Sequence, residues 1–177
     1  IMVGEIRDLE TAQMAVQASL TGHLVLSTLH TNDAPSAVTR LLDLGAPHYL
    51  IQSTLAGVVA QRLVRTLCPH CKVEGSQDEN AWRALTHGWD LPLPARVFVP
   101  TGCLECRNTG FLGRTGIYEM MTISPKLRGM IGPQLDLAAF EACALAEGMR
   151  PLRVSAAAQV ARGVTTVEEV QGVLPAE

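Results

Sequence analysis

Two short cysteine pairs constrain the fold of this chain more than any other feature. Each pair has the spacing Cys-x-x-Cys: Cys68 with Cys71, and Cys103 with Cys106. Such a pair turns two sulfurs toward one point, and two such pairs can surround one metal ion tetrahedrally. We expect Zn²⁺, because four thiolates form a closed site that suits an ion with no redox chemistry. The chain between the pairs must then fold back on itself.

Two disulfides, or four unrelated thiols, are the alternative interpretation of these cysteines. Disulfides belong to oxidising compartments, whereas no signal peptide opens this sequence and no apolar run has the length of a bilayer crossing. The fifth cysteine, Cys143, stands alone in an Ala-rich helical stretch and is predicted to be a buried small apolar residue. These features favour a reducing, cytoplasmic setting, and therefore a metal site.

The composition predicts an aliphatic core and argues against one class of partner. Of the 177 residues, 47% are hydrophobic but only 4% are aromatic, so Leu, Val, Ala and Met must fill the interior. This length is enough for one substantial domain or two small ones. The formal net charge of -3 argues against nucleic acid as the main partner, because phosphate binding needs a local surplus of Lys and Arg.

The first third of the chain alternates between predicted strands and helices. The expected order is a strand over 1–3, a helix over 9–18, a strand over 23–29, a helix over 36–44, and a helical or mixed stretch over 47–65. Asp8 is the expected N-cap of the first helix. The second apolar run is continuous, which is typical of a strand covered on both faces. This order indicates a parallel sheet in an α/β domain.

The part of the chain after the cysteines is predicted to be mostly helical. Residues 117–121 form an expected strand that rejoins the main sheet. Helices are then expected to begin near Ser124, Asp136, Pro151 and Thr166. At the last of these, Thr166 and Glu169 have the spacing of a capping box.

Polar side chains follow the first two predicted strands. Glu5 comes after the first strand and a glycine, and Thr28 and His30 lie at the end of the second. Ligands of open α/β sheets bind at the carboxyl ends of strands, so these residues are expected at one sheet edge. A carboxylate there can deprotonate water or hold Mg²⁺ through water, and the imidazole can sense a terminal phosphate. Taken alone, Glu5 is better explained as a surface carboxylate, and His23, at the opposite strand end, is better explained as a structural histidine.

Four arginines are candidates for binding phosphate or a neighbouring subunit: Arg7, Arg62, Arg65 and Arg114. A guanidinium group suits phosphate oxygens, although each of these residues, taken alone, is better explained as a solvated surface cation. The sequence has no GxxxxGK[ST] phosphate loop and no His-Glu-x-x-His motif. It therefore lacks the main phosphate cradle of a nucleotide hydrolase.

Several segments resemble, in order, the ATPases that drive type II secretion and type IV pilus assembly. Residues 2–12 (MVGEIRDLETA) resemble the Walker B segment of that family, and residues 21–32 (TGHLVLSTLHTN) resemble its histidine box. Residues 60–65, the tetracysteine region, residues 113–119 and residues 163–170 continue the resemblance in the family's order. It spans nearly the whole chain. The gap between the cysteine pairs is more similar to that of the secretion branch than to that of the pilus branch.

This resemblance implies a fold, an activity and partners. The fold would be α/β: the C-terminal portion of a RecA-like P-loop ATPase sheet, with a tetracysteine zinc subdomain and an all-helical C-terminal subdomain. The full-length protein would be a cytoplasmic homohexamer that binds ATP and Mg²⁺, lies peripherally at the inner membrane on secretion platform proteins, and powers type II secretion. Type IV pilus assembly is the alternative. A zinc-stapled protein-binding module without catalysis is an alternative of another class.

The resemblance also implies roles for individual residues. Glu5 would be the catalytic acid that activates water, and His30, His23 and Thr28 would belong to the nucleotide-responsive site. Arg114 would lie near the nucleotide or a subunit interface. The zinc ligands would be Cys68, Cys71, Cys103 and Cys106.

The resemblance further suggests how the chain is divided. We expect an ATPase core over 1–67, a zinc subdomain over 68–110, a strand over 111–123 that rejoins the ATPase sheet, and a helical subdomain over 124–177. The first residues have the pattern of the middle of a buried strand, so we expect a piece of a longer chain with its phosphate loop upstream. Such a piece is expected to be inactive alone.

Overall fold

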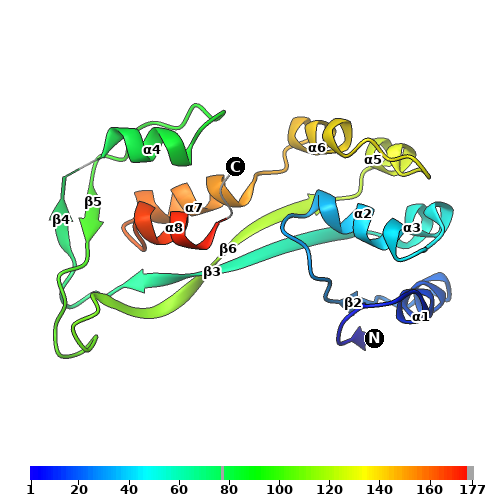
Figure 1. Ribbon diagram of the computed structural model, residues 1–177, viewed down its shortest axis with the longest axis horizontal. Helices are drawn as coiled ribbons and strands as arrows, with labels where there is room; N and C mark the ends of the chain where they lie inside the picture. The colour runs from blue at the N-terminus through cyan, green and yellow to red at the C-terminus, as the bar shows by residue number, and fades with distance from the viewer. Residues whose placement is uncertain (77, 175–177) are drawn as a thin grey trace. The chain divides into compact units, whose positions relative to one another are not determined.

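The computed structural model describes residues 1–76 and 78–174, which form two compact units (Figure 1). The first unit combines Ile1–Ala60 with Met120–Met149, and the second combines Gln61–Glu119 with the chain from Arg150 onward. Strands and helices alternate in the first third of the chain, as the sequence predicts for an α/β fold.

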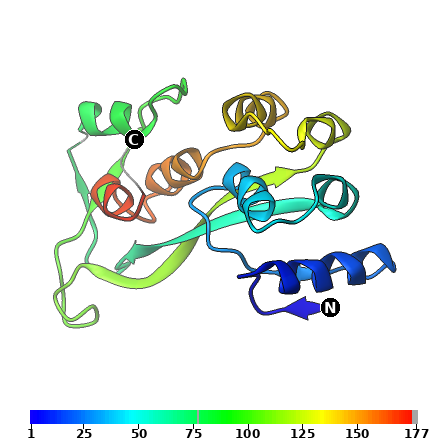
Figure 2. The same ribbon diagram turned by 45° about the vertical axis from the view of Figure 1, so that its right-hand side comes forward.

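The first unit contains one parallel strand pair and five helices of the described chain. Its elements are β1 (Met2–Val3), α1 (Leu9–Leu20), β2 (Leu26–Ser27), α2 (Pro35–Asp43), α3 (His48–Thr54), α5 (Pro125–Met130) and α6 (Leu137–Ala146). β1 and β2 run parallel, with Met2 opposite Leu26. Figure 2 shows α1 connecting these two strands, which is the βαβ arrangement that a parallel pair requires. The carboxyl ends of β1 and β2 therefore lie at the same edge.

The prediction that the second strand is covered on both faces is wrong for the described chain. Only Leu26 and Ser27 pair as a strand, and the side chains of Leu24 and Leu26 are 72% and 56% exposed. A strand pair this short offers little surface for packing, and the described part of the unit places no layer over these two leucines.

Two long strands, β3 (Gly57–Leu67) and β6 (Phe111–Thr122), pair with each other and contribute residues to both units. The N–H of Ile123 donates to the carbonyl of Ala56 at one end, and that of Cys68 to the carbonyl of Gly110 at the other. The strands therefore run antiparallel, as their arrows show in Figure 1. Within the described residues β6 pairs with β3 and not with β1 or β2.

The stretch 47–65, expected to be helical or mixed, is a helix only as far as Thr54. From Gly57 it is the strand β3, in which Ala60 and Val64 are buried while Val59 and Leu63 are exposed. This alternation, together with the β-branched Val58 and Val59, is typical of a strand. The short helix α3 lies before this strand and begins directly after Pro47, whose ring fixes the backbone angle φ at the helix start.

The second unit contains the hairpin of β4 (Val73–Gly75) and β5 (Val97–Val99), together with α4 (Glu79–Leu85), α7 (Leu152–Ala161) and α8 (Val167–Val173). Helix α4 packs on α7 and α8, which also contact each other (Figures 1 and 2). Trp82 of α4 and Val170 of α8 are buried in this unit. The core is aliphatic, as the composition predicts, with few aromatic members.

Most helices begin at the residues that the sequence predicts. The side chains of Asp8, Ser124, Asp136 and Thr166 each accept a backbone N–H at the first turn of their helix. Helix α7 differs, because it begins after Pro151 with no capping side chain of its own. The buried carboxylate of Glu119, on β6, accepts the N–H of Leu152 at 3.3 Å instead. A residue distant in sequence therefore caps α7.

Cys143 is buried within α6, as predicted. Within residues 1–76 and 78–174, no helix combines the length and the apolar character that a bilayer crossing requires.

Candidate metal centre and carboxylate–imidazole site

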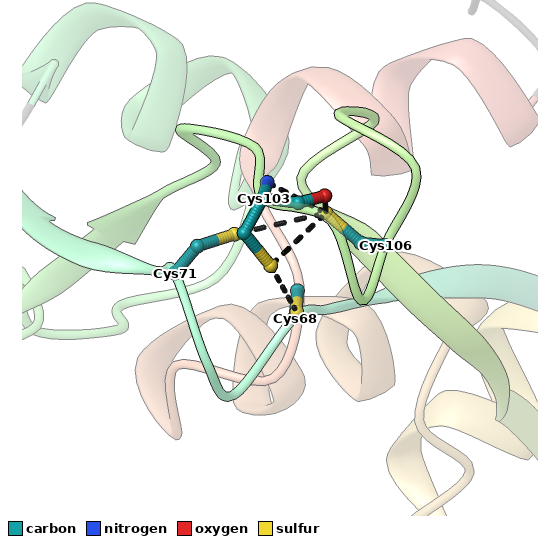
Figure 3. Close-up of side chains that lie close together, drawn as sticks. All are labelled: Cys68, Cys71, Cys103 and Cys106. Atoms are coloured by element: carbon teal, nitrogen blue, oxygen red, sulfur yellow. Dashed lines mark hydrogen bonds between the residues drawn. The ribbon is translucent and has the colours of Figure 1, made fainter.

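The four predicted metal ligands meet at one end of the β3–β6 strand pair. Cys68 and Cys71 follow β3, and Cys103 and Cys106 precede β6, so the pairing of the strands brings the two loops together. Figure 3 shows the four side chains converging from these loops.

The sulfur positions fit a tetrahedral ion. The Sγ atoms are 3.9 Å apart between Cys68 and Cys103, 3.8 Å between Cys71 and Cys106, and 3.7 Å between Cys103 and Cys106. All four Sγ atoms lie within 4.8 Å of one another. Four sulfurs around Zn²⁺ at roughly 2.3 Å would be separated by about 3.8 Å. The donor set therefore fits zinc in size and in chemistry.

Backbone N–H groups point at one of these sulfurs. The N–H of Cys103 and that of Gly110 each donate to the Sγ of Cys106 at 3.2 Å. Burial raises the pKa of Cys106, but these bonds and the neighbouring thiols outweigh it and lower the pKa to about 6. Burial raises the pKa of Cys68 to about 11. A metal ion deprotonates the thiols that coordinate it, so a bound ion would bring both to the thiolate form.

The loop geometry that aims these donors depends on a glycine. Gly110 has a φ of 75°, and a Cβ there would lie 2.3 Å from the Cβ of Pro100. Any side chain would therefore push the loop away from Pro100 and move the N–H of Gly110 from the Sγ of Cys106. The five cysteines are free thiols in the structure, and the four at this end of the strands lie close enough together to hold one metal ion.

A second cluster lies at the carboxyl ends of β1 and β2. The Nε2 of His30 is 2.9 Å from the Oε1 of Glu5. The Nε and Nη2 of Arg7 each lie 2.6 Å from the Oε2 of the same carboxylate. The hydroxyl of Thr28 donates to the carbonyl of Gly4 at 2.7 Å and ties the two strand ends together. The parallel pairing therefore brings Glu5, Thr28 and His30 to one edge, as the sequence predicts.

The electrostatics of this cluster favour an ionised carboxylate. The hydrogen bond from Arg7 is the largest cause that holds the pKa of Glu5 below its usual value, and the charges of Arg7 and His30 act in the same direction. The side chain of Glu5 is only 18% exposed, whereas that of His30 is 90% exposed. The cluster thus presents an anionic base with an imidazole that is open to solvent and to a ligand.

His23 lies elsewhere. Its Nδ1 is 3.1 Å from the hydroxyl of Thr21 and 3.3 Å from the carbonyl of Ala18, at the C-terminal end of α1. The structure therefore gives His23 a local partner set that does not include Glu5.

The candidate arginines have different surroundings. Arg65 binds the carboxylate of Glu169 and lies with its guanidinium carbon 4.2 Å from the ring centroid of Phe111. Arg62 donates to the carbonyl of Gln61 at 2.8 Å. Arg114 is exposed on β6. Arg7 alone of the four joins the Glu5 cluster in the described contacts.

Sequence reasoning missed Lys72, the residue immediately after Cys71. Its Nζ donates to the carbonyl of Gly163 at 2.7 Å and lies 4.7 Å from the ring centroid of Phe98. The only sequence signal is its position next to a ligand pair, because its partner is 91 residues away.

Known proteins resemble this chain over its whole described length. Residues 1–172 match the family described as "Type II/IV secretion system protein". The type IV pilus assembly ATPase TfpB of Acinetobacter baylyi is 51% identical over 99% of this chain and 30% of its own length. The type II secretion system protein HxcR of Pseudomonas aeruginosa is 49% identical over 96% of this chain and 32% of its own length. The chain thus spans about a third of these curated relatives.

Solved structures share its fold. The pilus retraction motor PilT with bound ADP matches 99% of this chain and 39% of its own, with a TM-score of 0.64 and 22% identity. The ATPase DotB of Legionella pneumophila matches 97% of this chain and 37% of its own, with a TM-score of 0.62 and 20% identity. The predicted α/β fold of an ATPase of this type is therefore confirmed.

Proposed function

The chain belongs to the Type II/IV secretion system protein family, and on that basis we propose that it is part of a cytoplasmic ATPase that powers protein export by type II secretion. The observation that carries the proposal is the 2.9 Å contact between the Nε2 of His30 and the Oε1 of Glu5 at the carboxyl ends of two parallel strands. A zinc-stapled binding module without catalysis would not require a carboxylate and an imidazole at that edge.

In the proposed reaction, Glu5 orients a water and accepts its proton. Its carboxylate is ionised, because the guanidinium of Arg7 lowers its pKa, and it is partly shielded from solvent. Bound ATP with Mg²⁺ would supply the phosphoryl group that the water attacks. His30 holds the Oε1 of Glu5 and leaves the rest of its ring exposed, so it can contact a phosphate and report its presence to Glu5. Thr28 keeps the two strand ends in register.

Assembly and partners are part of the same proposal. We infer a homohexamer that lies peripherally at the inner membrane and transmits work to platform proteins of the secretion system. His23 and the exposed Arg114 are proposed to act in nucleotide response or at a subunit contact. The tetracysteine centre has no open coordination position when it holds zinc, so its proposed role is structural.

Type IV pilus assembly is the second candidate, favoured by the 51% identity to the pilus assembly ATPase TfpB. The two can be separated by expressing the full-length protein in two strains, one lacking its type II secretion ATPase and one lacking its pilus assembly ATPase. Restored release of an exported enzyme would support secretion, and restored surface pili would support pilus assembly.

The catalytic assignment is tested with Glu5→Gln in the full-length protein, with ATP turnover and nucleotide binding both measured. Turnover should fall by roughly 10²–10⁴-fold, because a general base contributes about that much, while nucleotide still binds. Glu10→Gln is the matched control, since Glu10 is an exposed carboxylate on α1. Undiminished hydrolysis by Glu5→Gln would end the assignment.

A further inference from the structure

The first cysteine loop is joined on both sides to the turn between α7 and α8. Leu67 precedes Cys68, and its N–H donates to the carbonyl of Val164 at 2.8 Å. Lys72 follows Cys71, and its Nζ donates to the carbonyl of Gly163 at 2.7 Å. Two successive carbonyls of the turn thus accept hydrogen bonds from the two residues that flank the ligand pair.

The side chain of Phe98 also packs against this turn, at Gly163. A Cβ on Gly163 would lie 2.5 Å from the Cδ2 of Phe98, so the ring packs directly against the glycine backbone. The Nζ of Lys72 also lies 4.7 Å from the centroid of that ring, which is a cation–π distance. Gly163 has a φ of 66°, so the turn needs a left-handed residue where the ring leaves no room for a side chain.

Lys72 connects the predicted metal ligand Cys71 to the turn between α7 and α8. Its side chain is half-buried, and its ammonium has a carbonyl and a ring as partners. One covalent bond separates it from Cys71, so any movement of that ligand moves the backbone of Lys72. If one ion bound both Cys68 and Cys71, the distance between the neighbouring residues Leu67 and Lys72 would be fixed. The positions of the two carbonyls that accept their hydrogen bonds would then be restrained as well.

We propose that the metal-bound Cys68–Cys71 loop is a clamp on the α7–α8 turn, with Lys72 as its positioning residue, so that metal occupancy governs the order of these two helices. Zinc would then act on the C-terminal helices and not only on the loops that ligate it. The proposal does not depend on the ATPase assignment, because it concerns contacts within the second unit.

Hydrogen–deuterium exchange tests the clamp. The zinc-loaded chain and the chelator-treated chain are compared by mass spectrometry, with zinc content measured in both. Removal of zinc should speed exchange in Leu152–Ala161 and Val167–Val173 by at least tenfold, while Leu137–Ala146 of the first unit stays unchanged. Unchanged protection of α7 and α8 after zinc release would overturn the proposal. An equal loss of protection in α6 would also overturn it, because the effect would then be general unfolding.

Lys72→Met provides the second test, because it keeps the apolar stem and removes the ammonium donor. The zinc content should stay the same, since Lys72 bonds a carbonyl and no sulfur, while exchange of α7 and α8 rises severalfold. Lys72→Arg should restore most of the protection. Lys126→Met, at an exposed lysine of α5, is the matched control. Wild-type exchange in zinc-loaded Lys72→Met would overturn the role of Lys72.

Discussion

The carboxylate of Glu169 binds Arg65 through two different groups of that residue. Its Oε1 accepts the backbone N–H of Arg65 at 2.9 Å, and its Oε2 accepts the side-chain Nε at 2.8 Å. Arg65 lies on β3 and Glu169 lies in the first turn of α8, so the pair attaches the helix to the strand. A backbone donor that loses this partner would have to find water or remain unpaired.

We expect Glu169→Ala to lower the free energy of unfolding by about 1–2 kcal/mol, the order of a lost hydrogen bond to a charged group at a partly exposed site. The side chain of Glu169 is 9% exposed and that of Arg65 is 54% exposed, which places the effect well below that of a buried pair. Chemical denaturation of the wild type and of Glu169→Ala measures this change in the free energy of unfolding. Glu168→Ala is the control, since Glu168 is an exposed neighbour on the same turn; equal losses for the two variants would contradict the role of Glu169.

The same pair should make stability depend on pH in the acid range. The hydrogen bond from Arg65 holds the pKa of Glu169 below its ordinary value of 4.5. A carboxyl with a lowered folded-state pKa stabilises the fold above its unfolded pKa and loses that contribution as the pH falls through its folded pKa. The difference in unfolding free energy between wild type and Glu169→Gln should therefore shrink as the pH falls below about 4.5. A difference that stays constant down to pH 3 would contradict this.

Glu169 also illustrates what sequence reasoning could and could not predict. Thr166 and Glu169 have the spacing of a capping box, and Thr166 makes its half: its hydroxyl accepts the N–H of Glu169 at 3.3 Å. The carboxylate turns to Arg65, 104 residues away, instead of completing the box. The local cap is encoded within four residues, whereas the choice of partner depends on which strand lies beside the helix.

The residues of the two candidate sites were also predictable from the sequence only in part. The cysteine spacing predicts one cluster, and the alternation of strands and helices predicts a shared edge for Glu5 and His30; the structure brings both sets of side chains together. Their catalytic and metal-binding roles stay predictions. Lys72 and Glu119 could not be found, because each acts on a helix that is distant in sequence and no local pattern marks a distant partner.

Arg7 should tune the basicity of Glu5. Its hydrogen bond is the main cause of the lowered pKa of Glu5, so Arg7→Ala should move that pKa upward. Carbon-detected NMR titration of the Glu5 carboxyl in this chain measures the shift directly. If Glu5 is the base of the ATPase proposed above, the acid limb of the pH profile for ATP turnover by the full-length protein should then move to higher pH, because a base must be ionised to act.

Arg40→Ala is the control for Arg7, since Arg40 is a cation on α2 outside the Glu5 cluster. An unchanged Glu5 titration in Arg7→Ala would contradict the electrostatic account. A shifted titration with an unshifted turnover profile would instead contradict the assignment of Glu5 as the base, so the two ideas can fail separately.

Replacing a cysteine of the cluster should affect metal content and thermal stability differently from replacing Cys143. Cys106→Ser should lose zinc and lower the melting temperature by on the order of 10 °C, because a structural metal contributes directly to folding free energy. Cys143→Ser should keep its zinc, because Cys143 lies in α6 of the first unit and belongs to no cluster of described ligands. A chelator should lower the melting temperature of wild type and Cys143→Ser alike, and leave that of Cys106→Ser unchanged. Full zinc binding by Cys106→Ser would show that the four sulfurs are not one ligand set.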